Sequence, residues 1–379
     1  MWVRAALKGC ATGITAAATT CAFAAAMAPV AHGFRPASAA AAQDAPRPAF
    51  AEWLAGVRAE ALARGVKAEI VDAALAGVEE PLPVVLERDR SQAETIFSLE
   101  RYVARRMTPK LITGGRAAMA RHRELLDEIG DGYGVPPRII AAIWGIESNY
   151  GGFTGVRPTV AALATLAWDP RRATFFRGEL FDALEILNRG DIDLAHLRGS
   201  WAGAMGQVQF MPSSYLRFAE DYDGDGRRDI WSTPADIFAS IANYLIGRGW
   251  IDGESWGREV KVAPDVDQRI RKEVAPRSGS CAATRTMIGP LTADRWQKLG
   301  VRLPGGRPLP KGDAPTSLVS GNERHFLVTP SYDAILDYNC SHAYAITVGL
   351  LSDAIASKAP VPAARAKAPK PARRRRAKG

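Results

Sequence analysis

One carboxylate, Glu147, interrupts the apolar segment IWGIESNYGG at 143–152. An ionised carboxylate is costly in apolar surroundings unless it is paired or protonated. A glutamate whose pKa is raised by desolvation suits a general acid that cleaves a glycosidic bond near neutral pH. Glu147 is therefore the candidate catalytic residue. The alternative is a glutamate at a helix end whose stem packs and whose carboxylate reaches water.

A glycine-rich segment, GSWAGAMGQVQFMPSSY at 199–215, carries hydrogen-bonding side chains among apolar ones. Glycine lets the backbone turn tightly or approach a ligand closely. Ser200 and Gln209 are the candidates here, and Gln209, between two apolar neighbours, suits a sugar hydroxyl or amide. The alternative is a structural turn in which the backbone satisfies Gln209.

An acidic loop, DYDGDG at 221–226, follows the pattern of an EF-hand from its first to its sixth position. Aspartates occupy the first, third and fifth positions, and a glycine follows at the sharp turn. Position 12 is Ser232 instead of a bidentate glutamate, which lowers the affinity expected for calcium. The alternative is a solvated acidic turn. The loop predicts calcium ligands from Asp221, Asp223, Asp225 and the backbone carbonyl of Arg227.

The positive charge of the chain is concentrated at its two ends. The net charge is +9 over 379 residues, yet 1–39 and 358–379 contain no acid, so the body between them is mildly acidic. That distribution argues against a nucleic-acid-binding fold and predicts no nucleic-acid partner. The tail, 358–379, is too poor in apolar bulk to fold. It would either attract the protein to anionic wall or membrane surfaces or act as a solubilising extension.

The first 39 residues have the pattern of an export signal. Arg4 and Lys8 precede an Ala-rich apolar stretch, and Ala37-Ser38-Ala39 offers a cleavage site. The expected location is therefore periplasmic or secreted, with a membrane anchor as the alternative. Removal of the signal would leave two cysteines, Cys281 and Cys340, in an oxidising compartment. A disulfide is expected, and two buried thiols are the alternative.

Helical periodicity dominates the chain up to about residue 250, and short runs at 259–262 and 325–329 have strand character. The length favours two or three domains. Helices are expected at 113–130, from Pro136-Pro137 to Glu147, and at 158–167, 173–189, 212–220, 234–248 and 341–356. The predicted division is 1–39 signal peptide, 47–130 helical region, 131–250 catalytic core, 251–333 small β-containing module, 334–357 terminal helix and 358–379 tail.

Taken together, the motifs resemble the membrane-bound lytic murein transglycosylase B family of the lysozyme-like superfamily. The matching elements are GIESNYGG, GSWAGAMGQVQFMPSSY, the acidic loop, IANYL at 241–245 and YNCSHAY at 338–344. The resemblance extends from about Phe50 to Leu351. It implies a mainly α (α+β) fold: a lysozyme-like catalytic core, a helical flanking domain and a small β-containing insertion.

The resemblance also implies residue roles. Several polar and aromatic residues would line the cleft that binds the saccharide. A later aspartate, Asp236, would provide the calcium ligand that Ser232 at position 12 of the loop does not. Calcium would be structural, and catalysis would need no cofactor. The residues implied to bind substrate are Ser200, Gln209, Tyr244, Tyr338, Asn339, Tyr344 and Tyr102.

The implied activity is cleavage of the MurNAc-β-1,4-GlcNAc bond of peptidoglycan to leave 1,6-anhydro-MurNAc ends. Glu147 would act as acid and then as base, and the partners would be glycan strands, bound by a monomer. Two alternatives stay open. One is a hydrolytic muramidase, and the other is an inactive peptidoglycan-binding scaffold.

Overall fold

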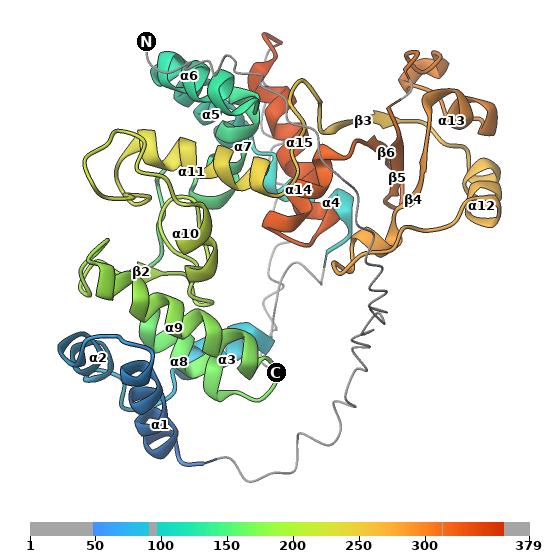
Figure 1. The fold of residues 1–379 in the computed structure, drawn as a ribbon. Helices are drawn as coiled ribbons and strands as arrows, with labels where there is room; N and C mark the ends of the chain where they lie inside the picture. The colour runs from blue at the N-terminus through green and yellow to red at the C-terminus, as the bar shows by residue number, and fades with distance from the viewer. Residues whose placement is uncertain (1–47, 91–96, 313, 360–379) are drawn as a thin grey trace, which may run out of the picture. The chain divides into compact units, whose positions relative to one another are not determined.

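A computed structural model describes residues 48–90, 97–312 and 314–359 (Figure 1). The predicted signal peptide and nearly all of the basic tail lie outside these residues. The described helices are α1 (Phe50–Ala63), α2 (Ala68–Leu75), α3 (Pro83–Arg90), α4 (Leu99–Arg106), α5 (Pro109–Arg121), α6 (Arg123–Tyr133), α7 (Pro137–Ser148), α8 (Thr159–Trp168), α9 (Ala173–Arg189), α10 (Pro212–Phe218), α11 (Pro234–Gly247), α12 (Pro264–Glu273), α13 (Ala293–Leu299), α14 (Ser331–Tyr338) and α15 (His342–Ala356). The strands are β1 (Arg157–Pro158), β2 (Arg198–Gly199), β3 (Gly257–Val260), β4 (Ile288–Leu291), β5 (Thr316–Ser320) and β6 (His325–Val328).

Helix α7 is the element around which the helical core is built. It packs against α5, α6, α11 and α15. Every residue from Ile139 to Ile146 is buried, so the helix is enclosed on all sides and not on one face alone. Gly145 is part of this packing, because a Cβ there would come within 2.5 Å of the Tyr150 ring. The helix is thereby held rigidly, and its last turn carries Glu147.

The expected helices are largely present, and one needs correction. The run expected at 113–130 is two helices, α5 and α6, because the backbone leaves the helical region at His122. Periodicity did not show this break, since apolar spacing continues across it. Four helices, α4, α12, α13 and α14, were not among those expected. They are only 7 to 10 residues long, and short helices give a weak periodic signal.

The larger sheet is antiparallel, with strand order β3-β6-β5-β4. Its register pairs Gly257 with Val328 and Ser320 with His325. Strands β3 and β6 fall close to the two runs expected from sequence. The sheet and helices α12 and α13 share a hydrophobic cluster that includes fully buried Trp296. This is the small β-containing insertion of the predicted fold class, which the structure confirms.

A second and larger hydrophobic cluster joins parts of the chain that are far apart in sequence. It combines buried residues of α1 to α3, of α7 to α11 and of α14 and α15. Helix α15 packs against α4, α5 and α7. The N-terminal helices and the terminal helix therefore share one core with the region around Glu147. The domain bounds drawn from sequence stay predictions.

Candidate active site

Glu147 lies at the end of α7, where the backbone turns sharply out of the helix. Asn149 and Tyr150 both adopt left-handed conformations, with φ of 52° and 59°. Such a conformation costs a residue with a side chain roughly 1–2 kcal/mol. The Tyr150 hydroxyl offsets this cost by donating to the Leu111 carbonyl at 3.0 Å, and its ring packs edge-on against Trp144. The turn thus holds the Glu147 side chain, which is partly exposed, at the rim of the core.

The Glu147 side chain lines a pocket of about 600 Å³. Its wall combines the end of α7 and the following loop with residues of α4 and α5. Among the described residues that line it, Glu147 is the only acid, and three cations accompany it. The lining residues are Arg105, Arg106, Thr108, Lys110, Leu111, Gly145, Ile146, Glu147, Ser148, Asn149 and Phe153.

Tyr344, in the first turn of α15, contacts the candidate catalytic residue directly. Its hydroxyl donates to Glu147 Oε1 at 2.6 Å. Burial raises the pKa of Tyr344 well above its usual value, and the nearby Glu147, Tyr338 and Tyr102 raise it further. Tyr344 is therefore a protonated donor across the physiological pH range. Tyr102, on α4, belongs to the same neighbourhood.

Two other predicted cleft tyrosines bond to backbone carbonyls. The Tyr244 hydroxyl donates to the Asp337 carbonyl at 2.7 Å, and the Tyr338 hydroxyl donates to the Val208 carbonyl at 2.7 Å. Tyr244 is only 4% exposed, and its ring lies 4.6 Å from that of Tyr338. These contacts tie α11 and α14 to the glycine-rich segment. Their roles in binding substrate stay predictions.

Asn339 follows α14 directly and is partly buried. Its amide donates to the Ile335 carbonyl, and its carbonyl accepts from Ser341. The residue thus shapes the short link between α14 and α15, next to Tyr338 and within five residues of Tyr344.

The glycine-rich segment is held by its own polar side chains. Ser200 Oγ accepts from the amides of Ala202 and Ala204, and Gln209 Nε2 donates to the Gly206 carbonyl at 2.8 Å. Gln209 adopts a left-handed backbone conformation, with φ of 51°. Ser200 and Gln209, the two predicted saccharide contacts in this segment, therefore also have a structural role. For Gln209 this agrees with the alternative of a structural turn.

Sequence reasoning gave no role to Gln207, which connects two distant elements. Its Oε1 accepts from Trp144 Nε1 at 2.7 Å, and its Nε2 donates to the Trp231 carbonyl at 2.8 Å. The bond joins α7, near Glu147, to the glycine-rich segment. Two further groups were missed as well: the cations of α4 and α5, and the exposed Phe153. The Arg105-Arg106 pair just before the Thr-Pro helix start was the available signal.

The predicted disulfide is confirmed. Cys281 and Cys340 are bonded, closing a sequence separation of 59 residues. Close by, the Thr286 and Tyr332 hydroxyls bond to the two ring nitrogens of His342 at 3.0 and 2.9 Å. Together these contacts attach the 281–286 segment to the start of α15, two residues before Tyr344.

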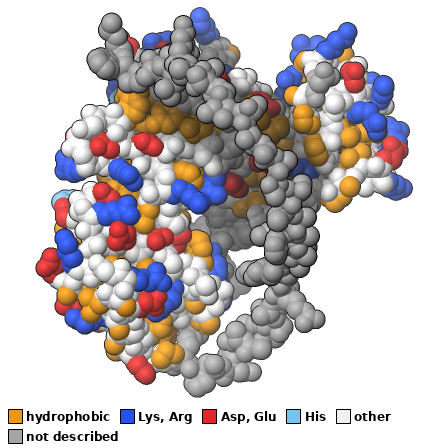
Figure 2. Space-filling model, viewed as in Figure 1, with side chains coloured by type: hydrophobic (Ala, Val, Ile, Leu, Met, Phe, Trp, Pro, Cys, Tyr) orange, Lys and Arg blue, Asp and Glu red, His pale blue; other side chains and the backbone are white. Residues whose placement is uncertain are grey.

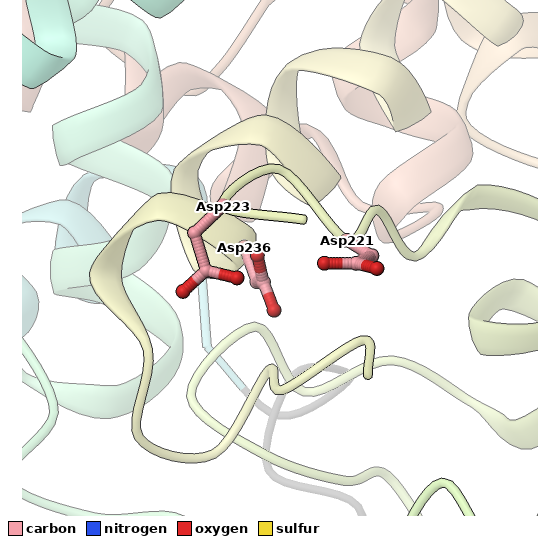
Figure 3. A group of neighbouring side chains, drawn as sticks. All are labelled: Asp221, Asp223 and Asp236. Atoms are coloured by element: carbon pink, nitrogen blue, oxygen red, sulfur yellow. The ribbon is translucent and has the colours of Figure 1, made fainter. Parts of the chain in front are cut away.

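Three of the predicted calcium ligands lie together (Figure 3). Oxygens of Asp221 and Asp223, from the loop, and Asp236, from the first turn of α11, lie within 4.8 Å of one another. Asp236 is fully buried, and its carboxylate accepts from the amides of Tyr222 and Asp229. Asp221 Oδ1 is buried without a hydrogen-bond partner among the described residues. Hard oxygen donors of this kind fit a calcium ion.

The structure does not bring the Asp225 carboxylate into this group, and the Arg227 carbonyl stays a predicted ligand. The Asp225 carboxylate accepts from the Arg227 amide and faces the Arg227 guanidinium at 3.3 Å. The local repeat of aspartates suggested Asp225, but the group is completed from α11 instead. At position 12, Ser232 donates to Asp229. That carboxylate also accepts from the amides of Trp231 and Ser232, so it organises the turn.

Comparison with known proteins identifies the family. A family described as the transglycosylase SLT domain matches residues 49–353. The chain belongs to this family. It is 41% identical over 155 residues to membrane-bound lytic murein transglycosylase B of Escherichia coli K12. That match spans 41% of this chain and 43% of the relative, so it covers less than half the length of either.

Solved structures agree with this family assignment. SltB3 from Pseudomonas aeruginosa, in complex with NAG-anhNAM-pentapeptide, is 40% identical with a TM-score of 0.73, covering 81% of this chain and 80% of that one. The Escherichia coli lytic transglycosylase Slt35, in complex with calcium, is 28% identical with a TM-score of 0.65, covering 82% and 94%. The mainly helical, lysozyme-like fold class is thereby confirmed. Within the described ranges, no helix of this transglycosylase-family chain is long and apolar enough to cross a bilayer.

Proposed function

We propose that this chain is a lytic transglycosylase that cleaves the MurNAc-β-1,4-GlcNAc bond of peptidoglycan and leaves 1,6-anhydro-MurNAc ends. The observation that carries the proposal is a pocket with one acid, Glu147, held by the Tyr344 hydroxyl at 2.6 Å. A glycosidase that works with two protein carboxylates would place a second one across the scissile bond. None of the described residues that line this pocket supplies it.

One carboxylate is sufficient for an intramolecular transfer. Glu147 would donate its proton to the leaving glycosidic oxygen as the C1–O4 bond breaks. The resulting carboxylate would then take the proton of the C6 hydroxyl as O6 of the same sugar bonds to C1. Glu147 ends as it began, and no water is consumed. The Tyr344 hydrogen bond would fix the direction of the carboxylate in both steps, and the substrate's N-acetyl group would stabilise C1 in place of a second carboxylate.

The substrate would be a glycan strand that carries peptide stems. The ligands solved with the Pseudomonas relative include a pentapeptide, and we extend that substrate class to this chain. The Escherichia coli relative is named membrane-bound. Together with the export pattern of 1–39, this supports a periplasmic or secreted location. The basic residues beyond 357 would add attraction to anionic surfaces.

Mass spectrometry of purified peptidoglycan digested with the protein tests the activity. Anhydro-muropeptides are the expected products. Reducing-end products, heavier by the mass of one water, would instead establish a hydrolytic muramidase, and no digestion would favour a binding scaffold. The Glu147→Gln variant should lose turnover by about 10²–10⁴-fold, the usual contribution of a general acid–base. Unchanged turnover in this variant would exclude Glu147 as the catalytic acid.

We also propose a structural calcium ion at Asp221, Asp223 and Asp236. The buried, unpartnered Asp221 Oδ1 and the close carboxylates of the group support it. Repulsion within such a group is relieved when a cation binds. The ion would hold the 221–226 loop against the first turn of α11, and no catalytic step depends on it.

A further inference from the structure

The pocket that contains Glu147 continues along helix α5 into a second pocket of about 570 Å³. Lys110 and Asn149 line both pockets, so the two form one groove. The second pocket follows α5 through Thr113, Ala117 and Arg121, which are exposed. We call the combined feature the α5 groove. It begins at the candidate catalytic residue and leads away from it.

The α5 groove is strongly positive. Its lining contains one acid, Glu147, and four cations, which are Arg105, Arg106, Lys110 and Arg121. This excess of positive charge contrasts with the body of the chain, which is mildly acidic. It also contrasts with the described residues on the face shown in Figure 2, where positive and negative side chains are interspersed. A concentration of one sign of charge in a concave surface attracts ligands of the opposite sign.

None of the four cations forms an ion pair with any residue of 48–90, 97–312 or 314–359. Two of them are engaged by uncharged groups, since the Arg106 guanidinium donates to the Ile146 carbonyl and Arg105 stacks on the Phe97 ring at 4.7 Å. Lys110 and Arg121 are therefore available to a ligand at the two ends of one helical face.

The distance between these two cations fits a short peptide. Eleven residues separate Lys110 from Arg121 on α5, which is a rise of about 16 Å. A fully extended peptide of five residues spans about 17 Å. Between the cations the wall has no charged side chain among the described residues and includes small residues, Gly114 and Ala117, and the Tyr150 ring. A chain that bears carboxylates at two separate positions could thus lie along α5, with the long side chains of Lys110 and Arg121 reaching them.

We propose that the α5 groove binds the carboxylate-bearing peptide stem of the glycan substrate, with Lys110 and Arg121 as its cationic contacts. This inference rests on the proposed function, because the stem is attached to the sugar that Glu147 would cleave. The groove would favour strands that still carry peptides over strands from which the peptides have been removed. Lys110 and Arg121 then determine specificity and take no part in the proton transfers.

Isothermal titration calorimetry of the full chain carrying Glu147→Gln measures the affinity of the α5 groove for a ligand. This variant should not cleave the ligand during the measurement. The ligands are GlcNAc-MurNAc-pentapeptide, the same compound with its peptide carboxylates amidated, and GlcNAc-MurNAc without peptide. The free-acid pentapeptide should bind on the order of five-fold more tightly than either of the others, as expected for two exposed ion pairs. Added salt should remove that advantage.

Two matched double variants make the test specific. Lys110→Gln with Arg121→Gln should bring the affinity ratio close to one. Lys298→Gln with Arg295→Gln removes the same charge from exposed positions of α13 and should leave the ratio unchanged. Equal affinities for the three ligands in the parent protein, or a ratio that survives Lys110→Gln with Arg121→Gln, would overturn the proposal.

The outcome is separable from that of the proposed function. If the wild-type protein releases no anhydro products but shows the salt-dependent preference for the free-acid peptide, the catalytic proposal fails and the α5 groove is supported. If anhydro products form and no such preference exists, the opposite holds.

Discussion

At the scale of single residues, the site depends on one hydrogen bond between distant parts of the chain. Glu147 and Tyr344 are 197 residues apart, yet their oxygens lie 2.6 Å apart. A hydrogen bond to an ionised group contributes about 1.5–3 kcal/mol. Because burial keeps the Tyr344 hydroxyl protonated, the bond persists over the whole physiological pH range. Tyr344 thus positions the carboxylate without titrating itself.

The Tyr344→Phe variant should reduce kcat on peptidoglycan by about ten-fold, which corresponds to about 1.4 kcal/mol of transition-state stabilisation. The ring would still pack, so the melting temperature should change little. Tyr215→Phe is the matched control, since it removes a buried tyrosine hydroxyl that donates to the Arg228 carbonyl. An equal loss of kcat in both variants would contradict a positioning role for Tyr344.

At the scale of elements, loops and helix ends are held by specific polar groups. The acidic loop meets α11 through Asp236, and the disulfide and His342 hold the link into α15. Each of these contacts crosses between elements, so each controls how one element is placed on another. They should therefore respond to metal, to pH or to mutation before the core does.

Calcium should raise the melting temperature of the protein. Binding to the folded state alone stabilises it in proportion to the logarithm of the ligand concentration, by about 2.7 kcal/mol at a hundred-fold excess over Kd. Asp223→Ala should abolish the response, whereas Asp131→Ala, which removes an exposed carboxylate of α6, should retain it. Thermal scans with calcium and with a chelator measure this, and identical scans for the wild type would refute the site.

His342 should make the folded state sensitive to acid. Burial lowers its pKa from 6.5 to about 4. Between these values the unfolded chain binds a proton that the folded chain does not, so the free energy of unfolding falls as the pH is lowered from 6.5 towards 4. Above pH 6.5 the contribution is fully present. Denaturant titrations over this range should show a shallower decline for His342→Gln, and parallel curves would disprove the assignment.

At the scale of the whole molecule, the described chain has two hydrophobic clusters. The larger one combines the N-terminal helices, the region around Glu147 and α15. The smaller one lies within the β-containing insertion and centres on Trp296, whose Nε1 donates to the Thr316 carbonyl. Strands β5 and β6 contribute to both clusters, with Val319 and Phe326 in the larger one. Damage to the smaller cluster should therefore loosen the insertion first and reach the helical core only through these strands.

The Trp296→Ala variant should destabilise the insertion by about 3–5 kcal/mol, the usual cost of removing a large buried aromatic side chain. Hydrogen exchange should then speed up in strands β3 to β6 and stay slow in α7. Phe175→Ala is the control, because Phe175 is 52% exposed and surface changes of this kind cost little. Equal acceleration in α7 would show that the two clusters unfold as one unit.

The sequence by itself determined most of the helices, the two adjacent strands β3 and β6 of the sheet, the family and the candidate acid. These follow from local information: apolar spacing defines a helix face, and GIESNYGG places Glu147 at a helix end. The two cysteines could also be paired from sequence, since only Cys281 and Cys340 would remain if the predicted signal were removed.

Only the tertiary structure decided which polar groups meet. Local spacing favoured Asp225 as a calcium ligand, but packing leaves it outside the group and brings in Asp236, which only the family resemblance had predicted. Packing also assigns Tyr344 to Glu147 and turns Tyr244 towards a backbone carbonyl. The physical reason is that sequence periodicity records which side of an element is apolar, whereas the partner of a buried polar group depends on how separate elements pack together.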